Sequence, residues 1–147
     1  MDDDNEHDVR TGGRLDRTTM RALGRRAVTH PLVDGWRFEP DDLSPRLLRI
    51  ALDADAYPDA VEAARIDVHW FVTDEYYIHY LETRGDSRYQ CRWDRHPKTN
   101  APMTHFHPPP DAGDPEPTSP GDHHLAVLFT VLDWVSDRVK TLYDSDR

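Results

Sequence analysis

The sequence predicts an α+β fold: an antiparallel β-meander of four to six strands, a long C-terminal amphipathic helix packed on one face, and an N-terminal helix beside it. Two observations predict this arrangement. Between residues 64 and 93, three segments of strand-forming residues follow one another with short turns between them. From Leu125 to Leu142, apolar residues recur at steps of three and four. The 147 residues suffice for one domain with one modest core.

The N-terminal third predicts a tail, a helix and two strands. Residues 1–13 are acidic and contain Gly12-Gly13, so we expect a disordered tail before a single domain over residues 14–147. Residues 15–28 can form a helix, and His30-Pro31 should stop it because the residue before proline avoids the helical region. Residues 33–39 predict a short strand. Residues 46–54 are ambiguous, and we favour a strand.

The rest of the chain predicts the meander, an edge strand and the long helix. We expect strands at 64–72, 76–83 and 87–93, and the last of these alternates Cys91 and Trp93 with Arg92 and Asp94. Residues 94–102 predict a loop and residues 103–107 a short edge strand, which the prolines at 108–110 must end. Residues 111–121 predict an exposed loop, and residues 123–144 a helix.

The composition is acidic and unusually poor in lysine. There are 28 Asp and Glu against 18 Lys and Arg, and only Lys98 and Lys140 among the basic residues are lysines. This balance is typical of a protein from a salt-adapted cell, so the net charge of −10 argues only weakly against nucleic-acid binding. Cys91 is the single cysteine, which excludes an internal disulfide and predicts a small core residue. The sequence has neither a long apolar run nor a secretory signal, so we expect a cytoplasmic protein without membrane contact.

Five polar side chains form the chemically interesting group: Arg92, Asp94, His96, His105 and His107. If the strand at 103–107 pairs with the meander, the two histidines at its end share one face and His96 lies near them. Imidazoles so placed could act as general base and acid on a phosphodiester, with Arg92 holding the phosphate charge. A metal site with a carboxylate ligand and ordinary surface histidines are the alternatives. We predict no metal and no cofactor, because no His-x-x-x-His or cysteine pair is present.

The segment from Cys91 to Pro97, followed by the segment from Thr104 to Pro110, resembles the signature of the TumE-like family of toxins in toxin–antitoxin pairs. The resemblance covers about residues 64–143 and leaves some sixty residues before it as an extension. It implies a growth-inhibiting protein that acts on RNA and is neutralised by a helix-turn-helix antitoxin. Carried over residue by residue, the motif positions of the family fall on the five residues of the polar group: Arg92, Asp94, His96, His105 and His107.

The function that we expect is therefore a metal-independent endoribonuclease. One of His105 and His107 takes the 2′-hydroxyl proton, and the other, or His96, protonates the leaving oxygen. Trp93, Arg95 and Lys98 are expected to contact substrate. The alternative from another class is a non-catalytic interaction module that binds a protein partner through the sheet and the arginine-bearing N-terminal helix. An exposed edge strand could pair two copies into a homodimer.

Overall fold

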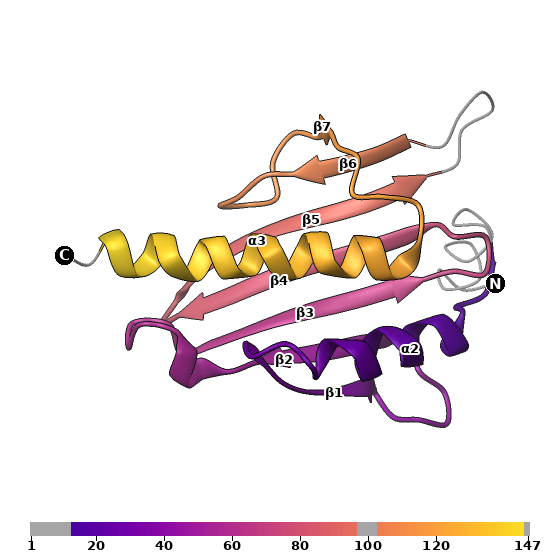
Figure 1. Cartoon of the computed structure of the whole chain (residues 1–147), viewed down its shortest axis with the longest axis horizontal. Coiled ribbons are helices and arrows are strands. Elements are labelled where there is room, and N and C mark those ends of the chain that lie inside the picture. The colour runs from indigo at the N-terminus through magenta and orange to yellow at the C-terminus, as the bar shows by residue number, and fades with distance from the viewer. Residues whose placement is uncertain (1–12, 97–102, 146–147) are drawn as a thin grey trace.

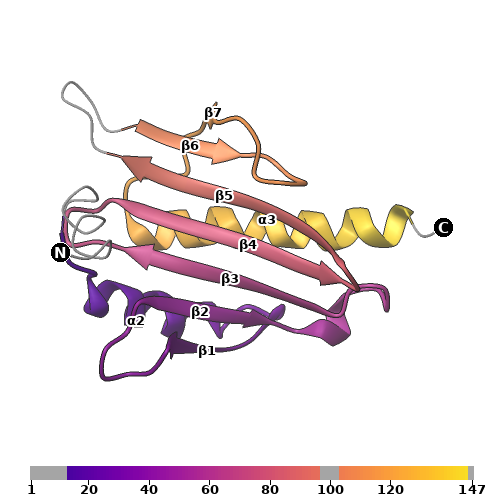
Figure 2. The ribbon, with the colours of Figure 1, turned by 180° about the vertical axis from the view of Figure 1, so that it is seen from behind.

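A single antiparallel sheet forms one layer of the structure, and two helices form the other. The computed structural model describes residues 13–96 and 103–145. The seven strands are hydrogen-bonded in chain order, β1-β2-β3-β4-β5-β6-β7, so every connection joins neighbours. Both helices cover the same face of the sheet, as Figure 1 shows with α2 and α3 in front of the strands. Seen from behind, in Figure 2, the strands lie in front, and no described helix covers this open face.

The element boundaries follow the sequence pattern closely. The helices are α2 (Arg17–Ala27) and α3 (His124–Ser145), and a 3-10 turn spans Ala54–Ala56. The strands are β1 (Val33–Glu39), β2 (Leu47–Leu52), β3 (Ala63–Trp70), β4 (Tyr76–Arg84), β5 (Ser87–His96), β6 (Met103–His107) and β7 (Glu116–Pro117). The expected α+β meander with its two helices is confirmed, and the ambiguous segment 46–54 contains a strand, β2. The expected tail over residues 1–13 lies outside the described residues except for Gly13.

The strand count is higher than expected, because β7 adds a seventh strand. Its two residues pair with His105 and Phe106 of β6, so β6 is not the free edge that the sequence suggested. A two-residue strand that contains Pro117 carries no alternating pattern, and the segment 111–121 therefore resembled a plain loop. The pairing continues where the Thr118 N–H donates to the Thr104 carbonyl at 3.3 Å.

The core lies between the sheet and the two helices. Alternate residues of each central strand point toward the helices, such as Ile66, Ile78 and Cys91, and all three are buried. Trp134 of α3 packs edge-on against Trp93 at a ring distance of 5.5 Å. None of the described helices is long and apolar enough to span a membrane.

Helix α2 approaches the sheet very closely at Gly24. A Cβ atom there would collide with the Trp36 ring of β1, so only glycine fits between helix and strand. The helix begins at Asp16, whose carboxylate accepts hydrogen bonds from the backbone N–H and the hydroxyl of Thr19. These contacts fix where α2 begins and how it lies on β1.

Candidate functional site

The cluster of polar side chains predicted from the sequence does assemble, on the open face of the sheet. In the pairing of β5 with β6, Arg92 lies opposite His107 and Asp94 opposite His105. Residues on one strand that are two apart share a face, so His96 joins the same group. The antiparallel pairing of β5 and β6, and not the intervening loop, therefore brings the five side chains together. We call them the Asp94 cluster: Arg92, Asp94, His96, His105 and His107.

Asp94 is the centre of the cluster and its most buried member, with 1% of its side chain exposed. Its Oδ2 accepts hydrogen bonds from His107 Nε2 at 2.9 Å and from Arg92 Nε at 3.3 Å. Its Oδ1 is buried and makes no hydrogen bond within the described residues. Two imidazole nitrogens face Oδ1, His105 Nδ1 at 3.4 Å and His96 Nε2 at 3.5 Å. A buried carboxylate oxygen that faces two imidazoles is well placed to orient them, because small ring rotations bring either nitrogen into hydrogen-bond range.

His107 has both ring nitrogens engaged. Its Nδ1 lies 2.9 Å from the Gly113 carbonyl oxygen, which can only accept a hydrogen bond. Its Nε2 lies 2.9 Å from Asp94 Oδ2 and 3.3 Å from Arg92 Nη2. Both ring nitrogens of His107 therefore have protein partners, which leaves neither of them for a substrate.

His105 and His96 are the more accessible imidazoles. The His105 side chain is 18% exposed, and within the described residues its Nε2 has no hydrogen-bond partner. The His96 side chain is 34% exposed, and its Nδ1 lies 3.5 Å from the Tyr77 hydroxyl oxygen. The two rings are 6.4 Å apart, centre to centre. Two imidazoles at this separation can reach opposite sides of one phosphate group.

Two of the three residues expected to contact substrate lie on the covered face of the sheet. Trp93 is buried beneath α3, on the face opposite the Asp94 cluster. Arg95 also points to the helix side, where its guanidinium donates to the Gly121 carbonyl and lies over the Tyr76 ring. Both residues therefore serve packing and the approach to α3, because alternation along β5 places odd-numbered side chains on the covered face. Lys98 lies outside the described residues.

Sequence reasoning missed Tyr77 and the Gly113 carbonyl. Tyr77 lies opposite Asp94 in the pairing of β4 with β5, and its ring contacts His96 edge-on at 5.2 Å. The short turn at Arg84-Gly85-Asp86 fixes this register, so counting back from the turn could have found Tyr77. The Gly113 contact comes from the irregular segment after β6, for which the sequence carries no comparable signal.

A metal site was one alternative interpretation of these histidines. Within residues 13–96 and 103–145, no group of three or more His, Cys, Asp or Glu side chains is arranged to hold a metal ion.

The comparison with protein families identifies the group to which the chain belongs. The family described as Toxin TumE matches residues 21–139. The chain belongs to the TumE toxin family. The match includes the Asp94 cluster and begins at residue 21, so most of α2 and the strands β1 and β2 lie inside the family region and are not an extension to it. Comparison with curated proteins and with solved structures found no significant match.

Membership in the TumE family makes this protein the toxin component of a toxin–antitoxin pair, and it implies an antitoxin partner.

Proposed function

We propose that this TumE-family toxin is a metal-independent endoribonuclease and that the Asp94 cluster is its active site. The observation that carries the proposal is the arrangement around Asp94. One buried carboxylate faces three imidazoles and a guanidinium, and His105, whose Nε2 has no partner within residues 13–96 and 103–145, lies on the open face of the sheet. Imidazole pairs suit RNA cleavage near neutral pH because they exchange protons there.

In the proposed reaction, His105 Nε2 takes the proton from a ribose 2′-hydroxyl. The 2′-oxygen attacks the adjacent phosphorus, the bond to the 5′-oxygen breaks, and a 2′,3′-cyclic phosphate forms. His96 gives a proton to the leaving 5′-oxygen. Its two contacts near 3.5 Å are weak enough to be exchanged for substrate. Water is not consumed in this step.

The other members position these groups and balance charge. Asp94 orients His105 through Nδ1 and favours the imidazolium that forms when His105 accepts the proton. Arg92, with a half-buried side chain beside Asp94, supplies a guanidinium for the charge that develops on the phosphate oxygens. His107 holds Asp94 in place from the other side and acts as a positioning residue.

The test is RNA cleavage with a chelator present, in molar KCl as the acidic composition suggests. We expect His105→Ala to lower the rate by about 10²–10⁴-fold, the usual contribution of a general base. His107→Gln keeps one N–H for Asp94 and should cost about tenfold or less. His79→Ala is the matched control, because His79 lies on the same face but bonds to Gln90 at 2.8 Å.

Two outcomes would contradict the proposal. A His105→Ala variant that cleaves RNA at the wild-type rate would show that His105 is not the general base. Folded wild-type protein that cleaves no RNA would favour the non-catalytic interaction module instead. A helix-turn-helix antitoxin is the partner that we propose, and co-expression followed by co-purification tests it.

A further inference from the structure

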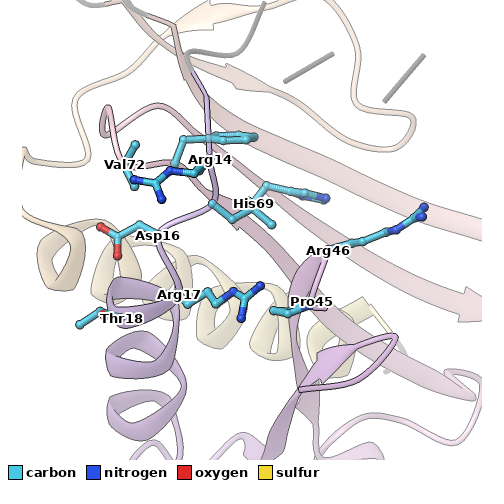
Figure 3. A pocket seen from close by; sticks show the side chains of 10 residues that line it. Arg14, Asp16, Arg17, Thr18, Pro45, Arg46, His69 and Val72 are labelled. Atoms are coloured by element: carbon cyan, nitrogen blue, oxygen red, sulfur yellow. The ribbon is translucent and has the colours of Figure 1, made fainter. Parts of the chain in front are cut away.

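A second group of basic side chains lies at the junction of α2, the β1–β2 loop and the end of β3. A pocket of about 740 Å³ opens there. Figure 3 shows Arg14 and Asp16 on one side, Pro45 and Arg46 across from them, and Arg17 and His69 between. Nothing in the proposed cleavage reaction uses this pocket.

Backbone pairing fixes the segment that carries two of these arginines. Leu15 forms an isolated antiparallel bridge with Phe71. The Asp16 N–H donates to the Trp70 carbonyl at 2.7 Å, and the Val72 N–H donates to the Arg14 carbonyl at 2.9 Å. Arg14 and Arg17 therefore flank a short segment that is hydrogen-bonded to the end of β3. The backbone on this side of the pocket is fixed by that pairing.

The pocket concentrates positive charge in an acidic protein. Three arginines line it against one acid, Asp16, although the chain as a whole carries a net charge of −10. Both carboxylate oxygens of Asp16 are held by Thr19 at the start of α2. Within the described residues, Arg14 and Arg17 form no ion pair with an acid. Guanidinium groups without an acidic partner offer planar sets of donors that match a phosphate well.

The pocket is also in line with the Asp94 cluster. His69, which lines the pocket, lies opposite Tyr77 in the β3–β4 pairing, Tyr77 lies opposite Asp94, and Asp94 lies opposite His105. These four side chains form one row across the open face. Strands in a sheet are about 4.8 Å apart, so His69 and Asp94 are separated by about 10 Å. A single strand of RNA can span that distance within a few nucleotides.

We propose that this pocket is a second phosphate subsite, which binds the backbone of the same RNA strand whose scissile phosphate lies at His105. This inference rests on the proposed function, because it takes RNA as the ligand of the open face. An acidic segment of a protein partner could also meet three arginines. The continuous row from His69 to His105 favours RNA, since it links the pocket to the Asp94 cluster without a break.

The experiment measures RNA binding separately from cleavage. A fluorescently labelled single-stranded RNA of about ten nucleotides is titrated against full-length protein that carries His105→Ala, at several KCl concentrations. The test variant adds Arg14→Gln and Arg17→Gln. The matched control adds Arg25→Gln and Arg26→Gln, which remove the same charge from exposed positions at the other end of α2.

If the pocket binds phosphate, the test variant should bind RNA about tenfold more weakly, and the control should bind as before. The slope of log K against log salt should also become shallower by about 0.7 in the test variant, because each phosphate neutralised on a single strand contributes about 0.7. A changed slope identifies lost phosphate contacts, which a merely structural effect would not produce.

Other outcomes overturn the inference in distinguishable ways. Unchanged binding and slope in the test variant would show that the pocket does not hold RNA. Unchanged RNA binding with weaker binding of the co-expressed antitoxin would assign the pocket to the protein partner. RNA that binds through the pocket but is not cleaved by wild-type protein would refute the endoribonuclease and leave the subsite standing. Wild-type protein that binds no RNA refutes both.

Discussion

The charged pair of Glu82 and Arg138 offers the sharpest test of how this fold is held together. Glu82 is completely buried between β4 and α3. Arg138 donates to both of its carboxylate oxygens, at 2.6 and 3.0 Å, and the Tyr80 hydroxyl donates at 2.7 Å. Burial first of all, with Tyr57 and Glu82 beside it, raises the pKa of Tyr80, so its hydroxyl stays protonated and available as a donor.

Replacing Arg138 with leucine would leave the Glu82 carboxylate buried without its main partner. Removing one member of a buried ion pair usually costs about 3–5 kcal/mol. Tyr80 remains as a donor, and Arg84 Nε lies 3.8 Å from the second carboxylate oxygen, so we expect the low end, about 3 kcal/mol. For a domain of this size, that loss lowers the melting temperature by about 6–12 °C.

The double variant Glu82→Leu, Arg138→Leu should recover most of this loss, because a buried ion pair and an apolar pair of similar volume are often close in stability. Urea unfolding followed by tryptophan fluorescence measures all three proteins. Arg37→Leu is the matched control: Arg37 pairs with Glu39 at the surface, its side chain is 61% exposed, and its loss should cost at most about 1 kcal/mol. The reasoning fails if Arg138→Leu costs no more than Arg37→Leu, or if the double variant is less stable than Arg138→Leu.

Three further predictions concern other parts of the covered face. Gly24→Ala should destabilise the fold by at least about 1–3 kcal/mol in the same urea assay, because the added Cβ meets the Trp36 ring; a neutral result would mean that α2 can move away from β1. Burial, with Glu82 nearby, raises the pKa of the Cys91 thiol, so a thiol reagent at pH 8 should react only after denaturant is added, and fast labelling of the native protein would contradict this. Burial and the neighbouring His123 lower the pKa of His124 below its ordinary value of 6.5. On acidification the unfolded chain therefore binds a proton at His124 before the folded protein does. The free energy of unfolding should fall as the pH drops below about 6.5. The His124→Gln variant should lose this part of the pH dependence, and an unchanged curve would refute it.

Much of the fold could be predicted because the strands carry strong alternation and short turns. The same alternation also predicts which face of the sheet each β5 side chain occupies. The prediction of substrate-contacting residues did not use this information. Along β5, Arg92, Asp94 and His96 occupy one face, so Trp93 and Arg95 had to occupy the other. A strict use of the two-residue period would have left both out of the substrate-contacting set on the sequence alone.

Other features depend on pairings that sequence patterns do not encode. Glu82 and Arg138 are 56 residues apart, and only the placement of α3 on β4 brings them together. β7 consists of two residues whose pairing is decided by how the chain returns after the prolines. The engagement of His107 depends on the Gly113 carbonyl in that same return. The histidines were therefore predictable as a group, whereas the engagement of both His107 nitrogens by protein partners was not.

The two faces of the sheet separate stability from the proposed chemistry, and this decides how variants should be interpreted. The ion pair of Glu82 with Arg138 and the apolar core lie on the covered face. His96 and His105 lie on the open face, outside that core, with 34% and 18% of their side chains exposed. Of the two, substitution of the more exposed His96 should change the free energy of unfolding less. Asp94 and His105 are both largely buried, so Asp94→Asn and His105→Ala need a stability measurement beside every activity measurement.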